Sequence, residues 1–218
     1  MKEYTQKFLE VTLEYDALRF GRFELKSGRI SPYFFDLGVV CSGDALKRIG
    51  DCYAHILCAQ DFFTEEDAPI IFGPAYKGTI IATATIISLL EYGENAFFSS
   101  LRKEEKKYGE TGLRLGRHID GCHVVFVDDV VSGGGTIRAA LNFISSHGFP
   151  VGIVIGFDRQ ERNMENGKSV LQTLRSELGI RIESIATLSD LCDFVRAHPK
   201  YRHFFGALDS YRSEFCIV

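Results

Sequence analysis

Uninterrupted runs of valine, isoleucine and phenylalanine alternate with helical segments through most of this 218-residue chain. A half-exposed strand alternates apolar and polar residues, whereas an unbroken apolar run indicates a strand buried on both faces. Such strands, separated by helices, predict an α/β fold with a central parallel sheet flanked by helices. Strands are expected in PIIFG, NAFFSSL, CHVVFVDD, VGIVIGFD and IRIESIATL, and helices in GTIIATATIISLLEY, GTIRAALNFISSHG, KSVLQTLRSELG and SDLCDFVRAH. Ser189 is the expected cap of the last helix.

The N-terminal segment has a different pattern. Helical periodicity runs from about Glu3 to Arg19, and a second helix is expected from Asp44 to Ala59. Between them, RFELKSGRISPYFFDL predicts two strands joined by a turn at residues 27–29. The length favours one compact domain over residues 1–218.

Composition limits the classes of function. A formal net charge of -4 argues against a general nucleic-acid binder, so no nucleic acid is expected as a partner. No apolar run reaches the roughly 18 residues that would suggest a membrane span, and the N-terminus lacks the apolar core of a secretory signal. Six scattered cysteines without a CxxC pair are typical of reduced thiols, so a cytoplasmic location without membrane partners is expected. Cys52, His55 and Cys58 are expected to share a helix face rather than hold a metal, because no fourth ligand accompanies them.

The residues that follow each strand are the informative ones, because ligands of parallel α/β sheets bind beyond the carboxyl ends of the strands. Three of these segments, GPAYKGT, RKEEKKYG and DRQER, carry lysine or arginine. The segment VVFVDDVVSGGGT instead ends its strand in two aspartates and continues into glycines. GPAYKGT has threonine where a nucleoside-triphosphate loop needs lysine, so that interpretation is excluded.

The aspartate pair and the glycine loop call for different parts of one ligand. Glycines at 133–135 let backbone N–H groups approach an anion, and the following helix presents its positive end to the same anion. Ser132 and Thr136 add hydroxyl donors. Asp128 and Asp129 require hydrogen-bond donors such as sugar hydroxyls, or a cation. A ribose 5-phosphate supplies both groups, and the basic strand ends imply a second, more highly charged phosphate.

These residues carry a resemblance. VVFVDDVVSGGGT resembles the signature that binds 5-phosphoribosyl 1-diphosphate (PRPP) in type I phosphoribosyltransferases. FGRFELKSGRISPYFFDLG, FGPAYKGTIIA, LRKEEKKYGE, FDRQER and LDSYRSEF, in this order, are similar to the orotate-specific members of that family. The resemblance implies the type I fold with an N-terminal hood over about residues 1–40. It also implies transfer of the ribosyl 5-phosphate of PRPP to orotate, releasing diphosphate, in pyrimidine (UMP) biosynthesis.

The resemblance also implies roles for individual residues. The residues that it implies for PRPP are Lys26, Tyr76, Lys77, Arg102, Lys103, Lys106, Tyr108, Asp128, Asp129, Val130, Val131, Ser132, Gly133, Gly134, Gly135 and Thr136. Those that it implies for orotate are Lys26, Phe34, Phe35, Ser132 and Arg159, the last through the orotate carboxylate. Lys26, Lys106, Asp128 and Asp129 are expected to be catalytic. Mg²⁺ is the expected cofactor, held through PRPP and water, and Asp128 and Asp129 are the side chains that could also contact it.

A homodimer with a shared active site is implied as well. A mobile loop from about Lys103 to Thr111 is expected to close over the site and to carry Lys106 into the partner. Two departures from the family pattern stand out: Tyr108 replaces a common histidine, and Ser132 and Gly135 replace two threonines. They predict altered phosphate contacts rather than loss of activity. A purine-type transferase, a non-catalytic PRPP sensor and a phosphatase or kinase are the alternatives, and Arg159 with SPYFF argues against the first.

Overall fold

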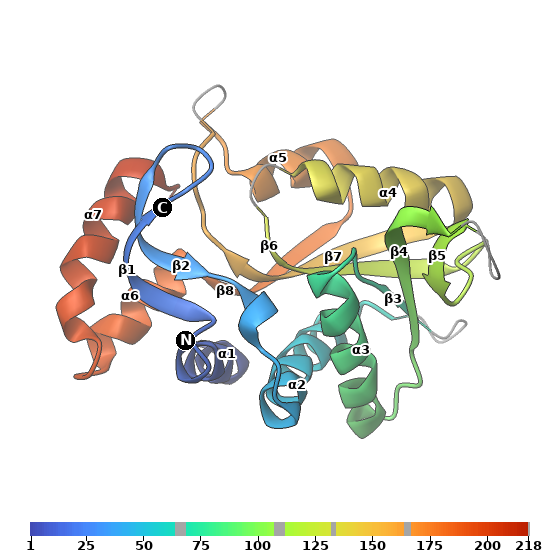
Figure 1. Cartoon of the computed structure of the whole chain (residues 1–218), viewed down its shortest axis with the longest axis horizontal. Coiled ribbons are helices and arrows are strands. Elements are labelled where there is room, and N and C mark those ends of the chain that lie inside the picture. Colours follow the sequence, from blue (N-terminus) through green and yellow to red (C-terminus); the bar gives the residue numbers. More distant parts are fainter. Residues whose placement is uncertain (64–68, 107–111, 132–133, 164–166, 218) are drawn as a thin grey trace.

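The computed structural model describes residues 1–63, 69–106, 112–131, 134–163 and 167–217, without the side chains of residues 105, 106 and 112. Its main sheet has six described strands in the order β5-β4-β3-β6-β7-β8 (Figure 1). The bounds of these strands are β3 Ile70–Phe72, β4 Phe97–Lys106, β5 Gly112–Gly116, β6 His123–Val130, β7 Phe149–Asp158 and β8 Arg181–Thr187. Strands β4, β3, β6, β7 and β8 are parallel, and β5 pairs with β4 in the antiparallel sense. The predicted parallel sheet is therefore confirmed, with an antiparallel edge strand that the sequence did not predict.

Helices cover both faces of this sheet. Helices α1 (Glu3–Glu14), α2 (Gly43–Ala59) and α3 (Lys77–Leu89) lie on one face, and α4 (Gly135–His147) and α5 (Val170–Leu178) lie on the other (Figure 1). Successive residues of one strand point to opposite faces. Accordingly, Val125 and Val127 of β6 belong to the core on the α1–α2 side, whereas Val124 and Phe126 belong to the core on the α4–α5 side. This two-sided burial is the physical reason for the unbroken apolar runs.

A two-stranded hairpin stands at one end of the sheet, beside the C-terminal helices (Figure 1). Its strands are β1 (Leu18–Glu24) and β2 (Ile30–Phe35), and Gly28 has the positive φ of 79° that its turn requires. Helices α6 (Leu188–Ala197) and α7 (Phe205–Phe215) lie next to it. Phe20 of β1 stacks on Phe204 with ring centroids 4.3 Å apart, so the hairpin is packed against C-terminal residues.

Two expectations about element ends are corrected by the structure. The first helix ends at Glu14 rather than near Arg19, because Asp16 takes a positive φ of 56° and β1 begins at Leu18. The last predicted helix is capped by Thr187, whose side chain accepts from the Asp190 N–H, and not by Ser189. Helix α7 was not predicted. Among the described residues, no helix is long and apolar enough to cross a membrane.

Candidate active site

A lysine joins three elements where β3 and β6 end. Lys77, the first residue of α3, places Nζ 2.5 Å from Oδ2 of Asp129 and 3.1 Å from Oδ1 of Asp36. Asp36 follows β2 directly, and its Oδ1 also accepts a hydrogen bond from the Gly38 N–H at 2.8 Å. Because β3 and β6 are neighbours in the parallel sheet, their carboxyl ends bring the predicted Lys77 and Asp129 together.

The aspartate pair on β6 is held by backbone and side-chain contacts. The Asp129 side chain is only 4% exposed, and its Oδ1 accepts from the Val130 N–H at 2.8 Å. Oδ1 of Asp128 accepts from the Asp129 N–H at 2.9 Å. Burial, followed by the negative charge of Asp129, raises the pKa of Asp128 to about 7. The pair therefore holds less than two negative charges near neutral pH, and a bound cation or hydrogen-bond donor would favour its fully ionised form.

The start of α4 forms the described part of the glycine loop. Gly134 is the residue before the helix and has a φ of 74°, and a Cβ added at Gly135 would meet no other atom within 4 Å. Gly135 and Thr136 are exposed, so the first turn of the helix is open to an anion. Val130 ends β6 and Val131 follows it, whereas Ser132 and Gly133 lie outside the described residues.

The guanidinium of Arg159 lies just beyond β7. Its Nη2 donates to Oγ of Ser31 at 3.1 Å, and Nε donates to Oε1 of Glu161 at 2.7 Å. Its charged group also lies 4.4 Å from the ring centroid of Tyr33. Only a tenth of the side chain is exposed. Arg159 thus reaches from the sheet to the hairpin, but it already has an acidic partner, which the sequence did not predict.

The predicted hairpin residues are dispersed. Lys26 is exposed in the turn of the hairpin. Phe34 is half-buried beside Phe23, with ring centroids 5.4 Å apart. Phe35 is 4% exposed and stacks on Phe157 at 5.0 Å. Since neighbouring residues of a strand face opposite sides, the ring of Phe35 lies in the core and only that of Phe34 faces outward.

The basic segment RKEEKKYG lies partly within β4. The sequence predicts residues 103–106 in a loop, but β4 extends to Lys106, and that residue pairs with Gly112 of β5. Lys103 places Nζ 4.4 Å from the ring centroid of Tyr76, next to Lys77. Arg102 Nη1 donates to the Arg114 carbonyl oxygen at 2.5 Å. The side chain of Lys106 and all of Tyr108 lie outside the described residues.

Sequence reasoning missed several residues that contact the predicted ones, among them Asp36, Tyr53, Glu161 and Tyr211. Asp36 and Glu161 have local signals, because each lies at a strand end beside a predicted residue. Tyr53 and Tyr211 have none, since their contacts join helices to residues more than 50 positions away.

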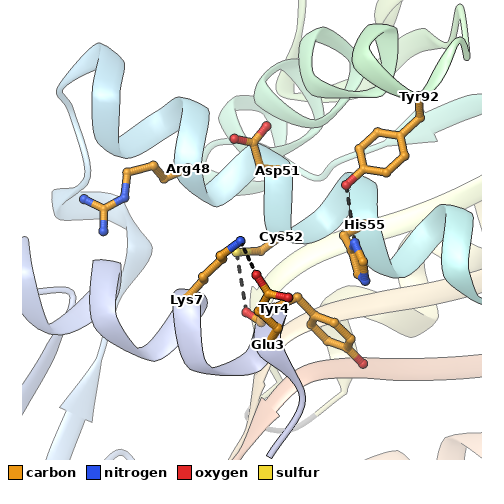
Figure 2. Close-up of a pocket in the computed structure, with 8 residues that line it drawn as sticks. All are labelled: Glu3, Tyr4, Lys7, Arg48, Asp51, Cys52, His55 and Tyr92. Atoms are coloured by element: carbon orange, nitrogen blue, oxygen red, sulfur yellow. Dashed lines mark hydrogen bonds and ion pairs between the residues drawn. The ribbon is translucent and has the colours of Figure 1, made fainter.

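A separate groove lies between α1, α2 and Tyr92 (Figure 2). Its volume is about 570 Å³, and its charged residues are largely paired, as Lys7 is with Glu3 at 2.7 Å. Cys52 Sγ donates to the Tyr4 carbonyl oxygen at 3.7 Å, and burial raises the pKa of this thiol to about 12. Within the described ranges, no group of three or more histidine, cysteine or acidic residues is arranged to hold a metal.

Comparisons with known proteins bear on the site. Residues 44–185 match the family described as "Phosphoribosyl transferase domain". The chain is 41% identical to the orotate phosphoribosyltransferase of Stenotrophomonas maltophilia (strain K279a), over 100% of this chain and 98% of the relative. It is 39% identical to that of Xylella fastidiosa (strain M12), covering 99% and 97%. The crystal structure of orotate phosphoribosyltransferase from Francisella tularensis superposes with a TM-score of 0.82 at 28% identity, covering 96% of this chain and 99% of that one.

Proposed function

The chain belongs to the phosphoribosyltransferase family, in its orotate-specific branch, and we propose that it uses the ends of β3, β6 and β7 to join orotate to the ribosyl 5-phosphate of PRPP. The products are orotidine 5′-phosphate and diphosphate, in the synthesis of UMP. The observation that carries the proposal is the contact of Lys77 with Asp129, beside Asp128, at the ends of two neighbouring parallel strands. That arrangement offers a cation for phosphate and carboxylates for sugar hydroxyls within one site.

PRPP is assigned to the β6–α4 segment. The 5-phosphate lies against residues 132–136, where the open first turn of α4 and its glycines suit an anion. The ribose hydroxyls donate to Asp128 and Asp129. The diphosphate is neutralised by Lys77 and Lys103, with Lys26 and Arg102 contributing, and Tyr76 lies beside Lys103. Lys77 leaves Asp129 for the diphosphate in this scheme, so PRPP binding itself frees the carboxylate for a hydroxyl group.

Transfer breaks the bond between C1 of ribose and diphosphate and forms a bond from C1 to a ring nitrogen of orotate. The N–H bond of that nitrogen breaks, and its proton leaves with the departing diphosphate. Positive charge develops on the sugar as diphosphate leaves, and the carboxylates of Asp128 and Asp129 stabilise it. Phe34 and Lys26 are assigned to the orotate ring, and Arg159 is assigned to its carboxylate, because a guanidinium matches a carboxylate in plane. Lys106 and Tyr108 are assigned to loop closure over the bound diphosphate.

Mg²⁺ is the proposed cofactor. The residues fit it, because Asp128 and Asp129 offer the oxygen donors that this ion prefers, and most of its ligands come from PRPP and water. When bound, the ion neutralises charge on the diphosphate.

A homodimer is proposed on the outer face of α3. Ile80, Ile87 and Leu90 are 46%, 55% and 60% exposed, and an apolar groove of about 400 Å³ runs between α2 and α3. Exposed apolar area of this kind marks protein interfaces. Lys77 begins the same helix, so a partner docked on α3 lies close to the site and can supply Lys106 to it. The N-terminal segment of about residues 1–40, which includes the hairpin, serves as the hood within a single domain of residues 1–218.

The test is the loss of orotate absorbance in the ultraviolet on mixing protein, Mg²⁺ and PRPP with orotate. Hypoxanthine, adenine and uracil are run in parallel. We expect orotate to be the only one of the four bases that is consumed. Its consumption should be abolished in Arg159→Ala and retained in Arg181→Ala. Arg181 begins β8, at the opposite end of the sheet from the strand ends that form the site. Turnover of a purine, or PRPP binding without turnover of any base, would overturn the proposal in favour of a purine-type enzyme or a PRPP sensor.

A further inference from the structure

Glu161 holds the guanidinium of Arg159 in a single orientation. Its Oε1 is 2.7 Å from Nε and 2.6 Å from Nη2 of Arg159, so one carboxylate oxygen bridges two nitrogens of the same fork. The same oxygen accepts a hydrogen bond from the Tyr211 hydroxyl at 2.7 Å. Because both Nε and Nη2 are engaged, the plane of the guanidinium is fixed and Nη1 takes no part in these contacts.

The groups that fix Arg159 come from distant parts of the chain. Ser31 belongs to β2, Glu161 follows β7, and Tyr211 belongs to α7. Tyr211 is 4% exposed and packs edge-on against Tyr33 with centroids 6.1 Å apart, so its hydroxyl group is itself held in place. The clamp of Glu161 and Tyr211 is therefore rigid on both sides.

Arg29 gives the cluster a net positive charge. Its Nη1 is 3.7 Å from Oε2 of Glu161, and its Nη2 donates to the Arg162 carbonyl oxygen at 2.9 Å. Two guanidiniums, Arg29 and Arg159, thus share the single carboxylate of Glu161. The cluster carries one positive charge, which matches the one carboxylate that distinguishes orotate from uracil.

We propose that Glu161, held by Tyr211, is a positioning residue that makes the site specific for a base carrying a carboxylate. The proposal rests on the proposed role of Arg159 as the partner of that carboxylate. Glu161 touches neither PRPP nor the reacting atoms in this scheme. It acts through Arg159, because an untethered arginine loses conformational freedom on binding and gains correspondingly less affinity.

The test compares ligands with and without the carboxylate. Affinities for orotidine 5′-phosphate, UMP and PRPP are measured by calorimetry, together with KM for orotate, in the wild type, Glu161→Ala, Glu161→Gln and Tyr211→Phe. Glu161→Ala should weaken the binding of orotidine 5′-phosphate about 10-fold. It should change the affinities for UMP and PRPP by no more than about 2-fold. Glu161→Gln keeps an oxygen that accepts hydrogen bonds, so its affinity for orotidine 5′-phosphate should fall only about 3-fold. Glu14→Ala is the matched control, since Glu14 pairs with Arg48 at 2.7 Å on the surface.

Tyr211→Phe tests whether the hydroxyl group acts through Glu161. This substitution should weaken the binding of orotidine 5′-phosphate about 3-fold in the wild type. It should have no effect in Glu161→Ala, because the carboxylate that accepts the Tyr211 hydrogen bond is then absent. Equal losses for orotidine 5′-phosphate and UMP in Glu161→Ala overturn the proposal. An unchanged affinity of Glu161→Ala for both orotidine 5′-phosphate and UMP also overturns the proposal, provided that Arg159→Ala still binds orotidine 5′-phosphate more weakly than the wild type. If Arg159→Ala also leaves the preference for orotidine 5′-phosphate over UMP unchanged, the assigned role of Arg159 itself fails. Should Glu161→Ala not fold, Glu161→Gln takes its place in the comparison of ligands, and equal losses of affinity for orotidine 5′-phosphate and UMP in that variant overturn the proposal.

Discussion

The hydroxyl group of Tyr53 donates a hydrogen bond to the backbone carbonyl oxygen of Asp128 across 2.8 Å. Tyr53 lies on α2 and is fully buried, so this bond connects the helical layer to the strand that carries the aspartate pair. Gly156 on β7 makes space for this hydrogen bond, because a Cβ at position 156 would lie 2.6 Å from the Tyr53 hydroxyl oxygen and 2.9 Å from the Asp129 carbonyl oxygen. Tyr33 is equally buried, but its hydroxyl group has no hydrogen-bond partner among the described residues.

The two tyrosines should therefore respond oppositely to loss of the hydroxyl group. Tyr53→Phe leaves the Asp128 carbonyl oxygen without its donor and should lower the free energy of unfolding by about 1 kcal/mol. Tyr33→Phe removes an unpaired buried hydroxyl group and should leave that free energy unchanged or raise it by up to about 1 kcal/mol. Urea unfolding of both variants measures the difference. A larger loss of stability in Tyr33→Phe would contradict the assignment.

The raised pKa of Asp128 predicts a pH dependence of stability. Between its ordinary value of 3.8 and about 7, the folded protein retains a proton that the unfolded chain releases. The contribution of Asp128 is thus most favourable below pH 3.8 and is lost as pH rises through about 7. Subtracting the urea-unfolding free energies of Asp128→Asn from those of the wild type over this range should show the fall. A difference that is flat or rises with pH would contradict the raised pKa.

Lys77 should couple the hairpin to PRPP binding. Lys77→Met removes the positive charge beside Asp129 and Asp36, and should weaken the binding of PRPP about 10-fold or more. It should also raise the pKa of Asp128 further, since Lys77 lowers it in the wild type. Calorimetric titration with PRPP gives the affinity, and Lys7→Met is the control because Lys7 pairs with Glu3 on the surface. Equal affinities in the two variants would remove Lys77 from the diphosphate site.

The turn between β3 and α3 should tolerate no side chain at Gly73. A Cβ at this position would overlap the backbone carbonyl group of Gly78, which follows Lys77. Gly73→Ala should therefore displace Lys77 and abolish PRPP binding. Gly206→Ala is the control, because nothing lies within 4 Å of a Cβ there and alanine favours a helix by about 1 kcal/mol. Thermal melts and PRPP titrations of both variants separate a local defect from unfolding.

The apolar face of α3 should control assembly. Ile87→Glu places a charge in the proposed interface and should convert the dimer to monomers, with loss of activity if Lys106 acts across the interface. Phe149→Glu makes the same change at an exposed residue of β7, 59% accessible, and should leave the dimer intact. Light scattering after gel filtration measures the mass. A dimeric Ile87→Glu variant would move the interface to another face.

The sheet could be predicted because its signal is local. Each strand is a short apolar run followed by a helical segment, so the strand ends of β3, β6 and β7 that carry the predicted site residues could be located in the sequence. Edge strand β5 and helix α7 were missed, since Gly112–Gly116 has no apolar run and only Leu208 and Tyr211 of α7 are buried. The Lys77–Asp36 and Arg159–Glu161–Tyr211 contacts depend on packing between distant segments, which no spacing in the sequence records.

The surroundings of Arg159 also bear on synthesis of the protein. Its partners Ser31 and Tyr211 lie 128 residues before it and 52 residues after it. In the order of synthesis, the segments that carry the aspartate pair and Lys77 are complete before α7 is made. The guanidinium becomes fully clamped only once Tyr211 has emerged. The segments assigned to the sugar phosphate are therefore synthesised before the last segment that holds the arginine assigned to the base.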